Sequence, residues 1–108
     1  MDIDFINQKI ESYLSQGIDK FHIDNGETIV LMISGLRALR EFNSAIALYQ
    51  KYDALLRNPD IYPVALTNIL QVCNDCGNTK LLIRYAKELK AIEPNHPFVI
   101  KISKDHPL

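Results

Sequence analysis

The feature that most constrains the fold is a pattern of apolar residues at helical spacing that occurs twice, 37 residues apart. Residues 34–52 align with residues 71–89 at this offset, and the following apolar positions coincide: Ala45 with Leu82, Ile46 with Ile83, Tyr49 with Ala86, and Tyr52 with Leu89. A fixed period in the thirties is typical of helical hairpins that stack, because each hairpin has an apolar face that it cannot bury alone. The sequence therefore predicts an all-α chain of antiparallel helical hairpins stacked as a short solenoid.

The N-terminal third of the chain predicts one outer helix and one central helix. Apolar residues recur at helical spacing over residues 2–15, and Gly17 is expected to end this first helix. Asp24 followed by Glu27 is a capping-box pattern and predicts the start of the second helix. The residues that follow are apolar on most faces, so we expect this helix to be buried on two sides. Gly35, inside it, is expected to permit a close approach between helices.

The first hairpin is predicted over residues 27–59. Asn43 is the expected N-cap of its second helix. That helix then continues without a glycine until Pro59, which cannot extend it.

A second hairpin is predicted over residues 63–94. Pro63 suits the first turn of a helix, where its missing N–H costs nothing. Gly77 is a C-terminal signal, and Asn78 is an expected N-cap for the next helix. Residues 97–108 are expected to form a short C-terminal cap or a tail, which brings the expected number of helices to five or six.

Charge is balanced over the whole chain but unevenly distributed along it. The formal net charge is −1, residues 1–30 hold six acidic and two basic residues, and residues 79–108 hold six basic and three acidic ones. A chain without a basic excess is not expected to bind nucleic acid in general. The uneven distribution is compatible with solvated helix faces and with a dipolar molecule that orients a charged partner.

The sequence gives no sign of a membrane segment. No apolar run approaches the roughly 18 residues that a membrane-spanning helix needs, and the N-terminus is acidic rather than typical of a signal peptide. We therefore expect one domain over residues 1–108, in the cytoplasm.

The residues that could carry chemistry are few and scattered. Cys73 and Cys76 form a lone CxxC at an expected helix C-terminus, where the helix dipole disfavours a thiolate. A zinc site would need two more ligands, and His22, His96 and His106 are far apart in the sequence. We expect Cys73 to fill the core and His96 to lie exposed in a turn, and we predict neither a metal site, nor a cofactor, nor an enzyme.

The second hairpin carries a recognisable arrangement of positions. Counting back from Pro94, the apolar positions of its first helix are Leu66, Ile69, Leu70 and Cys73, Gly77 takes the turn, and EPNHP closes the unit. Residues 27–97 resemble the tetratricopeptide repeat (TPR) in this respect. They depart from it because Leu82 stands where a small residue is usual, no glycine lies between the second and third helices, and the period is three residues too long. The stretch NILQVCNDCGNTKLLIRYAKELKA also resembles a pentatricopeptide repeat.

The TPR resemblance implies a concave groove lined by the first helix of each hairpin. The resemblance implies that the groove is lined by Glu27, Leu31 and Ser34 from the first hairpin, and by Val64, Thr67, Asn68 and Gln71 from the second. All of these except Glu27 are predicted to bind the partner. Asn68 stands at a position that often contacts a ligand backbone in that family. The Lys/Arg set that binds a C-terminal carboxylate is missing, so the resemblance implies an amphipathic helix of a partner protein as the ligand.

Three function classes follow from these resemblances. The first is a small TPR-like adaptor or chaperone, and the stretches REFNSAIAL, NPDIYPVAL and CNDCGN are similar to the needle-subunit chaperones of type III secretion. The second is a structural subunit of a larger assembly, because LREFNSAIALYQKY and DIYP resemble subunit Va of cytochrome c oxidase. The third is an RNA-binding protein of pentatricopeptide type, which the slightly acidic charge disfavours. The first class is the prediction, with a hetero-oligomer or a homodimer both open.

Overall fold

The structure of the chain is a computed structural model that describes residues 3–108, and this part is all-helical. Its helices are α1 (Ile3–Gln16), α2 (Gly26–Ala38), α3 (Phe42–Lys51), α4 (Asp53–Leu56), α5 (Tyr62–Asp75), α6 (Thr79–Ile92) and α7 (Pro97–Asp105). Within the described residues there are thus seven helices where five or six were expected. The prediction of an all-α chain is confirmed, and residue 2 of the expected first helix lies outside the described residues.

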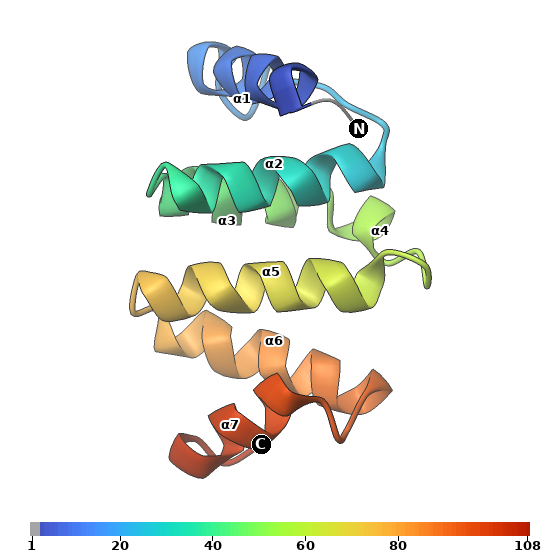
Figure 1. Cartoon of the computed structure of the whole chain (residues 1–108), viewed down its shortest axis with the longest axis vertical. Helices are drawn as coiled ribbons and strands as arrows, with labels where there is room; N and C mark the ends of the chain where they lie inside the picture. Colours follow the sequence, from blue (N-terminus) through green and yellow to red (C-terminus); the bar gives the residue numbers. More distant parts are fainter. Residues whose placement is uncertain (1–2) are drawn as a thin grey trace.

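The helices form a stack of hairpins. α2 and α3 make the first antiparallel hairpin, and α5 and α6 make the second (Figure 1). α5 packs against both α2 and α3, while α1 covers α2 at one end of the stack and α7 covers α6 at the other. α2 and α5 run in the same direction (Figure 1), so equivalent positions of the two helices lie side by side.

One apolar core runs through the stack. Its large, fully buried side chains come from both hairpins: Ile29, Met32, Ile33, Leu36, Leu48, Tyr49, Leu56, Leu66, Ile69, Leu70, Tyr85 and Leu89. The rings of Tyr49 in α3 and Tyr85 in α6 meet edge to face, with centroids 5.0 Å apart. The two hairpins are therefore joined through their side chains and not only through the chain that connects them.

Both hairpins turn with the same backbone geometry although their turn residues differ. Gly77 takes a φ of 72°, and Arg40, which precedes it by 37 residues, takes a φ of 60°. In both turns the N–H of the next residue donates to the carbonyl oxygen five residues before it, at 2.9 Å. This is the hydrogen bond of a Schellman C-cap, which normally requires glycine. The glycine missing between the second and third helices is thus replaced by an arginine in the left-handed region.

The predicted N-caps of the first hairpin were wrong by one or two residues. The cap of α2 is Asn25, whose Oδ1 accepts a hydrogen bond from the N–H of Thr28 at 3.1 Å, and Asp24 does not cap it. α3 begins at Phe42, after a Glu41 whose side chain makes no capping bond, so Asn43 lies inside the helix. In the second hairpin the prediction is confirmed, because Asn78 accepts from the N–H of Leu81 at 3.1 Å.

The expected continuous helix up to Pro59 is interrupted at Tyr52. α3 ends at Lys51, and the single turn α4 follows after Tyr52. The Tyr52 hydroxyl accepts from the N–H of Ile23 at 3.0 Å and approaches the carbonyl oxygen of Phe21 at 3.2 Å. The interruption accompanies these contacts with the segment between α1 and α2, which no local pattern in the sequence indicates.

The ends of the stack are closed by α1 and α7. A Cβ added to Gly35 would lie 2.5 Å from Cδ1 of Ile10, which confirms that Gly35 permits close packing of α1 on α2. α7 buries Val99 and caps the second hairpin. His96 is half-buried rather than exposed, and its Nδ1 accepts a hydrogen bond from the N–H of Phe98 at 3.0 Å. The C-terminal segment is therefore an ordered cap helix and not a tail.

Candidate functional site

The six groove residues predicted to bind the partner lie on one face of the stack, which we call the α2/α5 face. Its members are Leu31 and Ser34 on α2, and Val64, Thr67, Asn68 and Gln71 on α5. Residues three or four apart share one side of a helix, and the two helices pack alongside each other. Two of the apolar side chains on this face are open to solvent, since Leu31 is 41% and Val64 is 54% exposed.

The polar members of the α2/α5 face are partly engaged within the protein. The amide nitrogen of Asn68 donates to the carbonyl oxygen of Val30 at 3.4 Å, a long bond that joins α5 to α2. The hydroxyl of Thr67 donates to the carbonyl oxygen of Val64 in its own helix, at 2.8 Å. The side-chain amide oxygen of Asn68 therefore remains available to accept a hydrogen bond from a ligand. The Thr67 hydroxyl proton is already donated within α5.

An ion pair at one end of the α2/α5 face was missed by the sequence analysis. Nε of Arg37 lies 2.5 Å from a carboxylate oxygen of Asp75, and Nη1 of Arg37 donates to Oε1 of Gln71 at 3.3 Å. Arg37 and Asp75 stand near the C-terminal ends of α2 and α5. The repeat itself carried the signal, because their separation in the sequence is within one residue of the 37-residue period.

A cavity of about 310 Å³ opens beside this end of the face. It lies between the C-terminal half of α5 and α7, and we call it the α5–α7 cavity. Its apolar wall consists of Leu70, Leu82, Phe98 and Ile102. Gln71 belongs both to the cavity lining and to the α2/α5 face, so the two are continuous. Sequence analysis could not find the cavity because it depends on how α7 is placed against the second hairpin.

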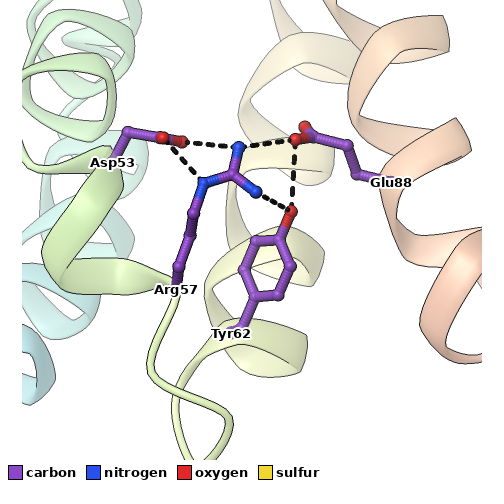
Figure 2. A network of polar contacts seen from close by, with 4 residues as sticks. All are labelled: Asp53, Arg57, Tyr62 and Glu88. Atoms are coloured by element: carbon purple, nitrogen blue, oxygen red, sulfur yellow. Dashed lines mark hydrogen bonds and ion pairs between the residues drawn. The ribbon is translucent and has the colours of Figure 1, made fainter.

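A cluster of polar contacts joins the two hairpins near the N-terminal end of α5, at the opposite end of that helix from Asp75 (Figure 2). The guanidinium of Arg57 donates to Asp53 at 2.8 Å and to Glu88 at 2.9 Å, and Nη1 lies 3.2 Å from the Tyr62 hydroxyl. The hydroxyl donates in turn to Glu88 at 3.2 Å. Hydrogen bonds with the two carboxylates raise the pKa of Arg57 above its usual value. All four side chains are hydrogen-bonded within the cluster. We therefore interpret it as a structural link between α4, α5 and α6.

Tyr49 is a core residue rather than a ligand-binding one. Its side chain is 1% exposed, and its hydroxyl has no hydrogen-bond partner among the described residues. Burial raises the pKa of Tyr49 well above that of a free tyrosine. The placement of Tyr49 among the repeated apolar positions of the sequence is therefore confirmed.

The two cysteines differ in environment. Cys73 is fully buried as predicted, and this burial raises the pKa of its thiol to about 12. Cys76 is exposed, and both cysteines are free thiols. A buried thiol that resists ionisation is a poor nucleophile and a poor metal ligand.

Residues 3–108 hold neither a metal-site candidate nor a membrane-span candidate. No group of three or more His, Cys, Asp or Glu residues in this part of the chain is placed to hold a metal ion. None of its helices has the length and apolar character required to cross a bilayer.

Comparison with known proteins gives no further assignment. No protein-family model, no curated protein and no solved structure matches the chain. The resemblance to tetratricopeptide repeats therefore stays a prediction.

Proposed function

We propose that the chain is a protein–protein interaction module, a small TPR-like adaptor or chaperone that holds an amphipathic helix of a partner protein on its α2/α5 face. The observation that carries the proposal is the exposure of Leu31 and Val64 on that face, beside uncharged polar side chains. An apolar strip with polar neighbours matches the apolar face and polar edges of an amphipathic helix.

The period of the chain supports the same ligand geometry. Leu31 precedes Asn68 by 37 residues, and Ser34 precedes Gln71 by the same interval. Because α2 and α5 run in the same direction, these pairs repeat across the face. A partner helix that crosses both α2 and α5 can therefore contact equivalent residues on one helix and then on the other.

A variant of the α2/α5 face tests the proposal. Leu31→Asp puts a charge where the partner's apolar face would lie, and its matched control is Leu14→Asp on α1. Leu14 is the same residue type and is 42% exposed, against 41% for Leu31. Tagged wild type and both variants would be incubated with nuclease-treated native lysate, and the captured proteins would be quantified by mass spectrometry.

The proposal expects one helical protein at near-equal amount with the wild type and with Leu14→Asp, reduced at least tenfold with Leu31→Asp. A tenfold loss corresponds to about 1.4 kcal/mol of binding free energy. Substitution of a residue that contributes to an interface typically lowers the binding free energy by about this amount. Equal capture by all three proteins would contradict it. A partner that is captured from untreated lysate but not from nuclease-treated lysate would favour the RNA-binding class, and capture only within one large assembly would favour a structural subunit.

A further inference from the structure

The apolar wall of the α5–α7 cavity is only partly covered by the chain itself. Leu70 and Leu82 belong to the buried core, whereas Phe98 and Ile102 of α7 pack against that core and remain partly exposed. Water beside such a wall makes few favourable contacts. An apolar group that replaces it gains the free energy of removing both surfaces from water.

The cavity continues the α2/α5 face toward the C-terminal ends of α2 and α5. Gln71 belongs to both, and Arg37, which donates to Gln71, also lines the cavity. A helix that lies across the α2/α5 face can therefore reach the mouth of the cavity with a side chain.

The charged groups at the mouth of the cavity favour partner helices that carry charged residues next to that side chain. Arg37 and Asp75 are paired with each other. Lys101 and Asp105, one turn apart on α7, also line the cavity, and neither takes part in an ion pair among residues 3–108. His106 lines the cavity too. The mouth thus offers one cation and one carboxylate that are not yet paired.

We infer that the α5–α7 cavity receives one large apolar side chain of the partner helix, such as leucine, methionine or phenylalanine. Near this anchor the partner helix carries an acidic residue that pairs with Lys101 and a basic residue that pairs with Asp105. The inference rests on the proposed function, because the α2/α5 face brings the helix to the cavity. The face accepts many amphipathic helices, and the cavity selects among them by requiring an anchor of the right size.

The probe is a phage-displayed library of amphipathic helices of about 20 residues, which span about 30 Å. The apolar face of these helices is varied among Ala, Leu, Met, Phe and Trp. The library is selected against the full-length protein, and the affinities of the selected peptides are measured by fluorescence anisotropy.

Two pairs of variants locate the binding. Asn74→Trp fills the cavity from an exposed position of α5 that lines it, and Asn7→Trp places the same residue at an exposed position of α1. Lys101→Glu reverses a charge at the mouth, and Lys104→Glu reverses one on α7 that does not line the cavity. Circular dichroism checks that each variant keeps its helices.

The inference predicts that selected helices share one large apolar residue, and that its replacement by alanine weakens binding at least about tenfold. Asn74→Trp should weaken binding to a similar extent and Lys101→Glu several-fold, while both control variants bind as the wild type does. Helices that are weakened by Leu31→Asp but not by Asn74→Trp or Lys101→Glu would overturn the inference and leave the proposed function standing. If the selection yields no binding helix, the proposed function fails and the inference fails with it.

Discussion

The two hairpins of the molecule reach the same shape from different local signals. The second hairpin has a glycine in its turn and an asparagine that caps the next helix. The first has Arg40 with a φ of 60° and Glu41 without a capping bond at the equivalent positions. Both turns nevertheless close with the same hydrogen bond at 2.9 Å.

This difference shows which forces fix the fold. A left-handed arginine costs about 1 kcal/mol or more relative to glycine, so the turn at Arg40 is not locally preferred. The packing of α2 and α3 against each other and against α1 and α5 outweighs that cost. The turn of the first hairpin therefore depends on tertiary packing, whereas the second hairpin carries its own turn and cap signals.

The largest expected effect comes from the core position just before each turn, which is Leu36 in one hairpin and Cys73 in the other, 37 residues apart. Both side chains are fully buried. Leu36→Ala should lower the free energy of unfolding by about 3 kcal/mol, and Cys73→Ala by about 1 kcal/mol, because fewer buried atoms are removed. Urea unfolding followed by circular dichroism measures both values.

Because one core joins the hairpins, each variant should unfold in a single transition. Two separate transitions for Leu36→Ala, with only the first displaced, would show that the second hairpin is stable without the first.

Substitutions in the two turns should change the free energy of unfolding in opposite directions. Gly77→Ala should lower the free energy of unfolding by about 1–2 kcal/mol, since a Cβ is strained at a φ of 72°. Arg40→Gly should raise it by about 0.5 kcal/mol, because relief of the strain exceeds the lost contact of the Arg40 guanidinium with the Phe42 ring, 5.1 Å away. Thermal unfolding measures both, and a destabilising Arg40→Gly would contradict this view of the first turn.

Alkaline pH should weaken the second hairpin through Cys73. Burial raises the pKa of Cys73 from 9.0 to about 12, so the folded protein keeps a proton that the unfolded chain releases. Stability from this group is complete below pH 9 and is lost as the pH rises toward 12, at up to about 1.4 kcal/mol per pH unit. Cys73→Ala, less stable than the wild type at pH 7, should equal it near pH 10. A constant difference between pH 7 and pH 10 in urea unfolding would argue against a buried, protonated thiol.

The smallest single effect is expected at the cap position of the first hairpin, and the cap of the second hairpin provides the comparison. Asn78→Ala should lower the free energy of unfolding by about 1 kcal/mol, because the N–H of Leu81 loses its acceptor. Glu41→Ala, at the equivalent position, should change it by only a few tenths, since no capping bond is lost. Equal effects of the two substitutions would contradict the view that only the second hairpin has a stabilising N-cap.

The apolar spacing predicted the all-α class and the pairing of the long helices, but not the separation of α3 from α4. The 37-residue offset extended even to the turn at Arg40, where no glycine marks it. The cap positions were less predictable. Asp24 and Asn25 are adjacent candidates, and the choice depends on tertiary packing, because a Cβ on Gly26 would lie 2.8 Å from Cδ1 of Ile61. The break at Tyr52 likewise accompanies hydrogen bonds to a distant segment.

The six members of the α2/α5 face come from the TPR resemblance. Leu31 and Asn68, and Ser34 and Gln71, are also related by the 37-residue repeat, whereas Val64 and Thr67 have no counterpart among the six. The pairing of Arg37 with Asp75 and the α5–α7 cavity join side chains from different hairpins and from α7. Such contacts depend on the relative placement of helices, which periodicity alone does not determine. That the α2/α5 face binds a partner stays a prediction.

Site-specific photo-crosslinking tests the central claim most directly, because the repeat supplies matched positions on two sides of the molecule. A photoreactive phenylalanine analogue would replace Ser34 or Gln71 on the α2/α5 face, and Asn43 or Lys80 at exposed, equivalent positions of α3 and α6. The proteins would be irradiated in native lysate, and the crosslinked species would be identified by mass spectrometry. The account predicts the same partner protein from Ser34 and Gln71 and no partner from Asn43 and Lys80. Crosslinks that arise from Asn43 and Lys80 alone would contradict it.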